Sequence, residues 1–315
     1  MIFRRPMVTG AGGFIGSHLA YRLVQEESIE QVICVDIQMN QRLNMLSQNP
    51  KVKIVITDLN IGLGNENFET PDFVFALAAL NGTGRFYTNP FDVLKGSFLP
   101  TLSILNIYAG RVPILYSSSS EVYASTIDNF GGVVPTPEDV IPSFKDVRNP
   151  RWSYGAAKLL GEIALMSASS ELGAVGSIVR YHNVYGPDMG VDHFVPDFIS
   201  RARKDDFTLF GADQTRAFLY IDDAVEGTIL AARAASNSIP IYHLGTSEEL
   251  SIKMAAEIIM AQLGKDPRKI MALPAPVGSV NRRCADINLA NTELGWNPSI
   301  DFRTGISRYL SEIVI

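Results

Sequence analysis

The sequence predicts an α/β fold, with a Rossmann-type doubly wound parallel sheet followed by a smaller C-terminal α/β domain. Short apolar strands such as "VICVD" alternate with helix-length segments through the first part of the chain. Strands that are apolar throughout are typical of a parallel sheet covered on both faces. In addition, a glycine-rich turn follows the first strand, and the next strand ends in a carboxylate. Together these observations favour a nucleotide-binding type of α/β sheet.

The elements expected in the first half alternate regularly. The strand "MVTG" is followed by a helix at "FIGSHLAYRLVQEE", and the next strands are "QVICVD", "KVKIVITDL", "DFVFALAAL" and "VPILYSSS". The helical segment "FDVLKGSFLPTLSILNIYAG" comes before the last of these strands. A helix at about 151–172 and the strand "VGSIVRY" continue the pattern, which predicts a sheet built from βα units.

The pattern becomes less regular after residue 180. "HNVYGPDMGVDHFVPDFISRARK" mixes Gly, Pro and Asp with an apolar helical segment, which indicates a change from scaffold to binding elements. Further on we expect a strand at "FTLFG", a helix at about 222–235, a strand at "IYHLG", a helix at about 251–264 and a short helix at "DINLANTELGW". We therefore predict two domains, 1–180 and 181–315, with some segments of the second crossing back to the first.

Composition narrows the class of protein. The chain has 315 residues, 46% of them hydrophobic and 19% charged, as in ordinary globular enzymes. Its net charge is -6, and because Lys and Arg form no cluster, we expect no nucleic-acid partner. Without a signal peptide or a membrane-length apolar stretch, we expect a cytoplasmic protein with no membrane partner. Cys34 and Cys284 are far apart and are expected to be reduced, and the four histidines lack metal-ligand spacing, so no metal is expected.

The glycines of "VTGAGGFIG" predict a dinucleotide site. Gly10, Gly13 and Gly16 end a predicted strand and open a predicted helix, where backbone amides can approach a pyrophosphate. Asp36, at the end of the next strand, can accept hydrogen bonds from the adenosine ribose and would repel a 2′-phosphate, which favours NAD over NADP. Asp58 is a candidate contact of the adenine amino group. The alternatives are a structural turn for the glycines and a strand-terminating role for Asp58.

A tyrosine and a lysine in "WSYGAAK" form a candidate proton-transfer pair. Tyr154 and Lys158 are four residues apart in a predicted helix, so both side chains lie on one face. A lysine ammonium beside a tyrosine favours the phenolate, and we expect it to lower the pKa of Tyr154 and make it a general base. The alternative is an ordinary solvated helix face.

The motifs "TGAGGFIG", "TDL", "ALAA", "SSSSEVY", "YGAAK", "RYHNVYGP", "TRAFLYIDDA", "YHLGT" and "RRCADIN" occur in an order that resembles a known family. The chain is similar to the extended short-chain dehydrogenase/reductases, in particular the NAD-dependent nucleotide-sugar epimerases and dehydratases. The resemblance covers nearly the whole chain. It implies that a nucleoside-diphosphate sugar binds to the C-terminal domain and is transiently oxidised at C4.

The resemblance also implies roles for individual residues. Ser119, Tyr154 and Lys158 look like the catalytic Ser, Tyr and Lys, with Tyr154 taking the proton of a sugar hydroxyl. The residues expected to bind the cofactor are Gly10, Gly13, Phe14, Ile15, Gly16, Asp36, Asp58, Leu59, Ala78, Tyr154 and Lys158. The residues expected to bind substrate are Ser120, Asn183, Arg216 and Arg283, and arginine suits a diphosphate because its planar fork pairs with two oxygens. Residues that could set specificity are Asn81, Arg85, His182 and His193.

Glu121 raises the question of which reaction follows oxidation. Dehydratases of this family have an Asp-Glu pair here, in which the Glu removes the C5 proton and the Asp protonates the leaving hydroxyl. This sequence has Ser120 and Glu121, which also resembles the UDP-glucuronate decarboxylases. We therefore expect Glu121 to take part in chemistry at C5, by dehydration or decarboxylation. The alternatives are a plain 4-epimerase or net 4-dehydrogenase in which Glu121 only binds substrate.

Several positions depart from the family pattern, including Ala76 for a common His and Ser97 for a common Asn. They leave the candidate Ser-Tyr-Lys set intact, but they put in doubt which named activity applies. An alternative of another class is a non-catalytic NAD-sensing protein. The resemblance further implies a homodimer packed through the helices near 90–110 and 151–171.

Overall fold

The computed structural model describes residues 1–64, 69–275 and 279–313, and its centre is one parallel sheet of seven strands. The strands lie in the order β11-β6-β5-β4-β1-β2-β3, and every neighbouring pair is parallel. Their bounds are β1 (Pro6–Thr9), β2 (Val32–Asp36), β3 (Val52–Ile56), β4 (Phe73–Ala76), β5 (Ile114–Ser119), β6 (Gly176–Tyr181) and β11 (Ile241–Leu244). This order reverses direction at β1, so the predicted doubly wound α/β fold is confirmed.

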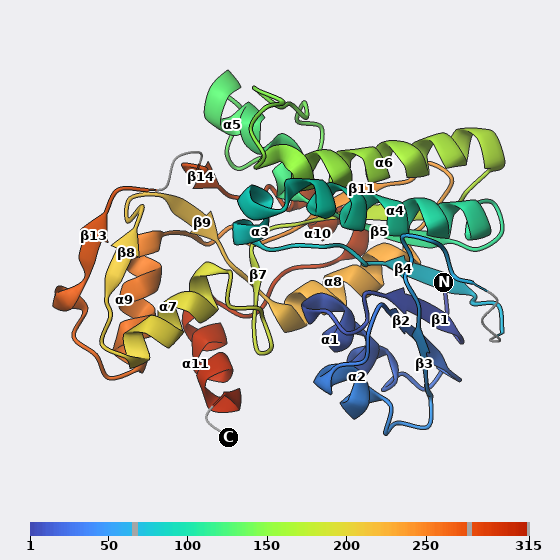
Figure 1. The fold of residues 1–315 in the computed structure, drawn as a ribbon, viewed down its shortest axis with the longest axis horizontal. Coiled ribbons are helices and arrows are strands. Elements are labelled where there is room, and N and C mark those ends of the chain that lie inside the picture. Colours follow the sequence, from blue (N-terminus) through green and yellow to red (C-terminus); the bar gives the residue numbers. More distant parts are fainter. Residues whose placement is uncertain (65–68, 276–278, 314–315) are drawn as a thin grey trace.

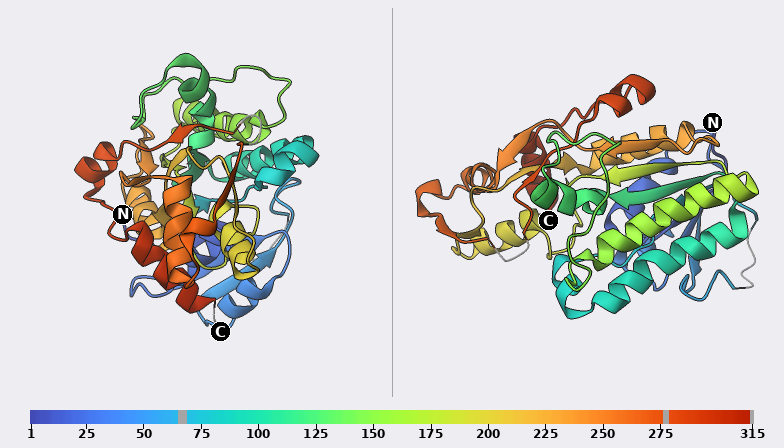
Figure 2. Two further views of the ribbon diagram at one scale, coloured as in Figure 1. Left: turned by 90° about the vertical axis from the view of Figure 1, so that its left-hand side faces the viewer. Right: turned by 90° about the horizontal axis from the view of Figure 1, so that it is seen from above.

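Helices cover both faces of the sheet (Figure 1). One face carries α4 (Pro90–Tyr108) and α6 (Trp152–Leu172), which lie side by side in Figure 2. The other face carries α1 (Phe14–Leu23), α2 (Gln41–Leu46) and α8 (Ile221–Arg233). Because both faces are covered, β1, β2, β4, β5 and β6 are buried nearly throughout, which accounts for their apolar sequences. The edge strand β3 is mostly half-buried or exposed.

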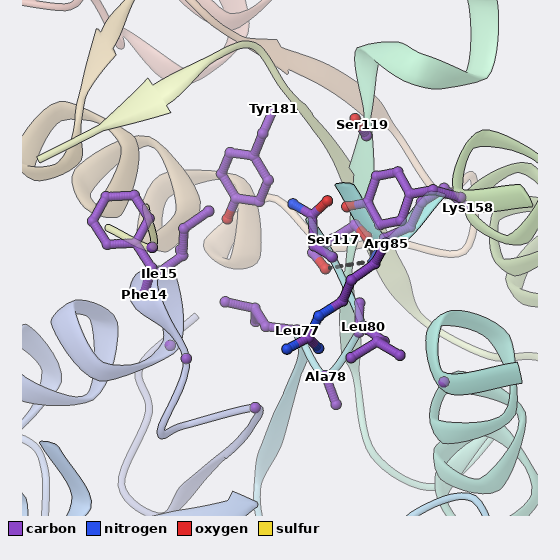
Figure 3. Close-up of a pocket in the computed structure, with 18 of the residues that line it drawn as sticks. Phe14, Ile15, Leu77, Ala78, Leu80, Arg85, Ser117, Ser119, Lys158 and Tyr181 are labelled. Atoms are coloured by element: carbon purple, nitrogen blue, oxygen red, sulfur yellow. Dashed lines mark hydrogen bonds between the residues drawn. The ribbon is translucent and has the colours of Figure 1, made fainter. Parts of the chain in front are cut away.

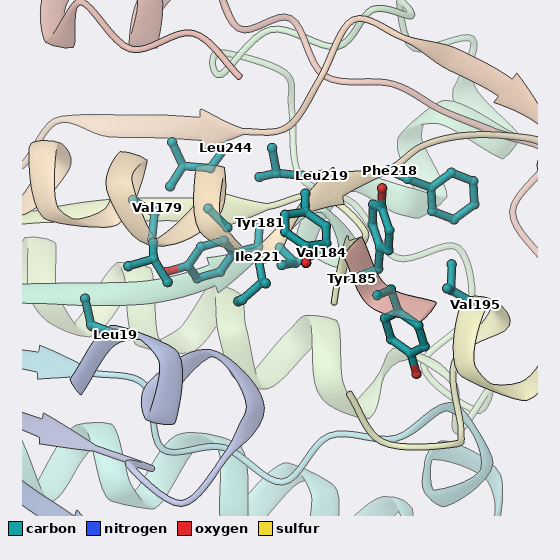
Figure 4. Close-up of a cluster of buried hydrophobic side chains, with 14 of the residues drawn as sticks. Leu19, Val179, Tyr181, Val184, Tyr185, Val195, Phe218, Leu219, Ile221 and Leu244 are labelled. Carbon is teal, nitrogen blue, oxygen red and sulfur yellow. The ribbon is translucent and has the colours of Figure 1, made fainter. Parts of the chain in front are cut away.

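The rest of the chain forms a smaller lobe at one end of the sheet (Figure 1). Its strands are β7 (Val184–Tyr185), β8 (Thr208–Phe210), β9 (Thr215–Ala217), β10 (Leu219–Tyr220), β12 (Glu249–Ser251), β13 (Met271–Leu273) and β14 (Arg282–Arg283). Its helices are α7 (Phe194–Arg203), α9 (Ile252–Gln262) and α11 (Phe302–Glu312), whereas α10 (Asn288–Leu294) packs on α8 and on β11 of the large sheet. An aromatic and aliphatic cluster that includes Tyr185, Phe218 and Leu244 joins this lobe to the sheet (Figure 4).

The helices and strands expected after residue 180 are found within a few residues of their predicted places. Two of them, α8 and β11, pack against or extend the large sheet although they follow residue 180 in sequence. The division at residue 180 stays a prediction. Four helices of the described residues were not expected from the sequence: α2, α3 (Thr83–Thr88), α5 (Ala124–Phe130) and α11. The short strands β7, β9, β10, β12, β13 and β14 were not expected either.

The serine run marks the point where β5 ends. Ser117 and Ser119 still belong to the strand, and a 3₁₀ helix begins at Ser120 and ends at Tyr123. The Ser119 hydroxyl caps this helix by accepting a hydrogen bond from the Glu121 amide at 3.2 Å. The cap turns the chain sharply, so that Glu121 lies at the carboxyl end of the sheet.

No helix in the described residues is both long and apolar enough to cross a membrane.

Candidate active site

A cavity of about 1540 Å³ lies where the carboxyl ends of the strands meet the smaller lobe. All of the residues expected to act in catalysis, cofactor binding or substrate binding line it, including Gly10 and Arg283. In Figure 3, Phe14 and Ile15 lie on one side of this cavity, and Ser119 and Lys158 lie on the other. Binding at the carboxyl edge of a doubly wound sheet is the expected place for a ligand.

The glycine turn has the shape that a pyrophosphate requires. Gly10 has a φ of +69°, and a Cβ atom there would lie 2.9 Å from the Ala78 Cα. A Cβ at Gly16 would lie 2.2 Å from the Gly10 carbonyl oxygen, so only glycine allows this close packing. Helix α1 begins just beyond Gly13 with no side-chain cap on its first amides. These free amides and the helix dipole fit a dinucleotide phosphate.

Two carboxylates follow β2 and β3 at the same edge. Asp36 accepts hydrogen bonds from the amides of Gly12 and Ile37, both at 2.8 Å, which fixes its carboxylate beside the glycine turn. This position fits a contact with an adenosine ribose. Asp58 accepts from the backbone and side-chain nitrogens of Asn60, at 2.9 and 2.7 Å. One oxygen of Asp58 is therefore already used locally.

Helix α6 places Tyr154 and Lys158 in the cavity wall. Lys158 is only 1% exposed and donates hydrogen bonds to the Ser117 carbonyl at 2.7 Å and to the Ser117 hydroxyl at 3.3 Å. Burial lowers the pKa of Lys158 to about 7, and the charge of Glu162 opposes this shift. The Lys158 ammonium is thus in balance with the neutral amine near neutral pH.

The Tyr154 ring stacks on Phe86 with 5.4 Å between centroids, and the Lys158 Nζ lies 5.7 Å from the Tyr154 ring centre. Burial raises the pKa of Tyr154, and the nearby Glu121 and Tyr181 raise it further. The sequence prediction that Lys158 lowers this pKa is therefore wrong for the protein without ligands. The reason is that loss of solvent around the ring outweighs a lysine that is itself partly neutral.

Glu121 is held between two arginines. Its Oε1 lies 2.9 Å from the Nη2 of Arg283 and 3.4 Å from the Nη2 of Arg151, and all three side chains are largely buried. Burial alone would raise the pKa of Glu121, but the charges of Arg283 and Arg151 outweigh it and lower that pKa. Glu121 is therefore an ionised and paired carboxylate.

Arg216 and Arg283 stand opposite each other on the paired strands β9 and β14. Burial, and then the charge of Arg283, lower the pKa of Arg216 to about 9. Two neighbouring guanidinium groups in one wall favour an anionic ligand, since an anion would relieve their repulsion. Asn183, at a φ of +39°, donates its side-chain amide to the Ala217 carbonyl at 3.1 Å, which ties it to β9.

Sequence reasoning missed Arg151. It lies at the N-terminus of α6, where a helix dipole disfavours a cation, and this unfavourable position was an available signal that the residue has a specific partner.

Among the candidate specificity residues, Asn81, Arg85 and His193 line the cavity. His182 is instead fully buried, with its Nε2 2.5 Å from the Tyr123 hydroxyl. Among the described residues, no group of three or more His, Cys, Asp and Glu could hold a metal ion.

The geometry agrees with what is found in known proteins. The sequence model of the NAD dependent epimerase/dehydratase family matches residues 7–245. The chain belongs to the NAD dependent epimerase/dehydratase family. Membership confirms the predicted family, the enzyme class and NAD as the cofactor. It also confirms epimerase/dehydratase chemistry over an NAD-sensing protein without activity.

Individual members of the family are similar over their whole length. The UDP-N-acetyl-alpha-D-glucosaminuronate decarboxylase of Bacillus cytotoxicus is 30% identical, covering 96% of this chain and 95% of that protein. A putative UDP-glucose 4-epimerase of Methanocaldococcus jannaschii is 29% identical, with 97% of each covered. The UDP-glucuronic acid 4-epimerase of Bacillus cereus, solved with UDP-glucuronic acid and NAD, has a TM-score of 0.82 and 26% identity, covering 98% of this chain and 99% of that one.

A second feature that the sequence did not reveal lies beside the glycine turn. Asn40 and Arg42 donate hydrogen bonds to the Gly12 carbonyl at 3.0 and 3.1 Å. Arg42 also donates to the Asp188 carbonyl, which belongs to the loop after β7. Arg42 thus links the glycine turn to the smaller lobe beside the NAD end of the cavity.

We expect Arg42→Ala to raise the dissociation constant of NAD about tenfold, because a linkage made of hydrogen bonds from a charged group is lost. Calorimetric titration of NAD into protein freed of cofactor measures this constant. Arg22→Ala is the matched control, since Arg22 pairs with Glu226 on the outside of the molecule and does not line the cavity. An unchanged constant in Arg42→Ala would show that the linkage does not retain NAD.

Proposed function

We propose that this enzyme acts on a nucleoside-diphosphate sugar that carries a carboxylate at C5, oxidises it at C4 and removes the carboxylate as CO₂. The observation that supports this choice most is the pairing of Glu121 with Arg283 and Arg151. A carboxylate that is ionised and paired with two guanidinium groups is a weak base toward a C–H bond. Decarboxylation needs no base at C5, whereas dehydration does.

The residue before Glu121 argues in the same direction. Loss of a C6 hydroxyl needs a general acid to protonate it, and this chain has Ser120 where a dehydratase has a carboxyl group. A serine hydroxyl is a far weaker acid than a carboxyl group, so it would protonate a leaving hydroxyl poorly. Arg151, which shares Glu121 with Arg283, is a further buried guanidinium group, and it suits a substrate that brings a carboxylate of its own.

The proposed first step is oxidation at C4. Tyr154 takes the proton of the C4 hydroxyl while Ser119 donates a hydrogen bond to the same oxygen, and Lys158 holds the nicotinamide ribose. Gly10, Asp36 and these residues would hold NAD, which would supply the hydride acceptor for C4 and the hydride donor for the later reduction. Tyr154 begins with a raised pKa, so the positive charges of Lys158 and the cofactor are needed to favour its phenolate.

The proposed second step is loss of the carboxylate. The C4 ketone draws electrons from C5, the bond between C5 and the carboxylate breaks, and CO₂ leaves with the electron pair remaining as an enolate on O4. Ser119 and the protonated Tyr154 both donate to that oxygen, which stabilises its charge. A solvent proton adds to C5, reduction restores the C4 hydrogen, and Tyr154 returns its proton to O4. The net products are CO₂ and a nucleoside-diphosphate pentose.

The proposed diphosphate site is formed by Arg216 and Arg283, with Asn183 beside them. The two guanidinium groups lie on adjacent strands and line the cavity. The similar enzymes named above act on UDP-sugars by their names, two of them on sugars with a C5 carboxylate. This likeness supports a uridine diphosphate sugar as the first substrate to try.

Product analysis in deuterated water tests the proposal. The enzyme and NAD are incubated separately with UDP-glucuronate, UDP-N-acetylglucosaminuronate, UDP-glucose, dTDP-glucose and GDP-mannose. Mass spectrometry then measures the masses of the products. We expect the uronates to lose CO₂ and to gain one deuterium at C5. Loss of water from a neutral hexose would instead identify a dehydratase. An isomer of unchanged mass without deuterium would identify a plain 4-epimerase and overturn decarboxylation.

We also propose a homodimer formed through α4 and α6. Leu160 and Ile163, three residues apart on α6, are 44% and 52% exposed, and Phe91 at the start of α4 is 68% exposed. An apolar face of this kind on two adjacent helices favours a partner surface. We expect sedimentation equilibrium to give a dimer, and Leu160→Lys with Ile163→Lys to give a monomer. A wild-type monomer at micromolar concentration would contradict the proposal.

We propose a cytoplasmic location as well. Cys34 and Cys284 are both free and buried, and burial raises the pKa of each thiol. Buried unpaired thiols of this kind suit a reducing compartment. Fractionation of cells that produce the enzyme would place it in the soluble cell extract.

A further inference from the structure

A buried ion pair lies behind the candidate catalytic residues. Glu162 is 4% exposed and follows Lys158 by four residues in α6, so it lies on the helix face that carries Lys158 and Tyr154. Its Oε1 and Oε2 accept hydrogen bonds from the Nε and Nη2 of Arg180, at 2.9 and 2.8 Å. The ion pair is bidentate, which is the strongest geometry for an arginine and a carboxylate.

The same carboxylate reaches the strand that carries Ser119. The Ser118 hydroxyl donates to the Glu162 Oε1 at 2.5 Å. Ser118 and Arg180 are direct partners on β5 and β6, so both point toward α6 from adjacent strands. Glu162 therefore ties α6 to the ends of two sheet strands at one point.

Other contacts fix the position of α6 along β5, close to the contacts of Glu162. The Tyr116 hydroxyl donates to the Lys158 carbonyl at 3.2 Å. A Cβ at position 161 would lie 2.2 Å from this hydroxyl, so Gly161 allows the helix to approach the strand. Lys158 in turn donates to the Ser117 carbonyl. The register between α6 and β5 thus sets where Lys158 stands relative to Ser119.

The charge of Glu162 matters because Lys158 is buried. A buried amine favours its neutral form, and a nearby carboxylate favours the ammonium. The ionisable groups around Lys158 are Tyr154 and Glu162 from α6, Tyr116 from β5, Glu121 from the 3₁₀ helix and Arg180 from β6, the last of these paired to Glu162. Among them, the Glu162 carboxylate acts directly on Lys158 to oppose the effect of burial.

We propose that Glu162 is a positioning residue, which holds α6 in register with β5 and supplies a negative charge that favours the ammonium form of Lys158 during turnover. The inference rests on the proposed role of Lys158 in holding the nicotinamide ribose and supporting the Tyr154 phenolate. It does not depend on which sugar is the substrate. Its action on the reaction passes through Lys158 and not through contact with the substrate.

The test compares two variants of the holoenzyme by the pH dependence of kcat, with the best substrate of the product screen. Glu162→Gln keeps the shape and an acceptor oxygen but removes the charge, whereas Ser118→Ala removes one contact and keeps the charge. We expect the alkaline limb of kcat in Glu162→Gln to move to lower pH by about one unit, which is about tenfold less ammonium at a given alkaline pH. We expect Ser118→Ala to melt at a lower temperature with its alkaline limb unmoved.

An alkaline limb that does not move in Glu162→Gln, together with a lowered melting temperature, would overturn the inference and leave Glu162 a purely structural residue. If Glu162→Gln does not fold because Arg180 is left unpaired, Glu162→Gln with Arg180→Met removes both charges, and a smaller downward movement is expected because the loss of the Arg180 cation partly offsets the loss of the carboxylate. An unmoved limb in that double variant would again overturn the inference. Wild-type turnover in Lys158→Met would overturn the proposed role of Lys158 itself. This variant therefore distinguishes a failure of the proposed mechanism from a failure of the inference about Glu162.

Discussion

Tyr154→Phe is expected to lower kcat by about 10²–10⁴-fold, the usual loss when a general acid-base group is removed. Phenylalanine keeps the ring that stacks on Phe86 at 5.4 Å, so the fold and the cavity wall should persist. What is lost is the oxygen that we propose takes the C4 proton and later stabilises the enolate. The rate of product formation measures overall turnover, and the absorbance of reduced nicotinamide after mixing with substrate measures oxidation at C4.

Tyr181→Phe is the matched control for this experiment. Tyr181 lines the same cavity, but its hydroxyl lies 2.6 Å from the Thr228 hydroxyl, within the core that joins α8 to the sheet. We expect this variant to lose some stability and to keep a kcat within a few-fold of wild type. If Tyr154→Phe turned over as fast as Tyr181→Phe, Tyr154 would not be the proton acceptor.

The fold and the cavity lining could be predicted from the sequence because their signals are local. Apolar strands, the glycines at 10, 13 and 16, and the carboxylate at 36 each lie within one βα unit. Parallel connections then bring the ends of all the strands to one edge, so residues far apart in sequence share a cavity. The placement of Asp36 beside Gly12, at 2.8 Å, follows from this topology.

The pairing of Glu121 could not be predicted in the same way. Its partners, Arg151 and Arg283, come from the start of α6 and from β14, and only the packing of the small lobe on the sheet brings them together. The pKa of Tyr154 was mispredicted for a related reason. Helical spacing shows that Lys158 is near, but the degree of burial depends on Phe86 and the walls around it, which the spacing does not contain.

Glu121→Gln is expected to slow CO₂ release by about 10²-fold while oxidation at C4 continues. Removing one member of a buried charge group costs about 3 kcal/mol or more, which corresponds to about 10² in rate if it falls on one step. Without Glu121, the guanidinium group of Arg151 loses its carboxylate partner and holds the substrate carboxylate too firmly for it to leave. Reduced nicotinamide should therefore accumulate with a 4-keto uronate.

Rapid mixing with UDP-glucuronate labelled in its carboxyl carbon separates the two steps, since nicotinamide absorbance reports oxidation and released label reports decarboxylation. Glu249→Gln is the matched control, because Glu249 also pairs with an arginine, Arg282, at 2.7 Å in the same lobe but does not line the cavity. The control should release CO₂ at the wild-type rate. Equal rates in Glu121→Gln and Glu249→Gln would mean that Glu121 takes no part in the C5 step and that its pairing with the arginines serves the structure of the lobe alone.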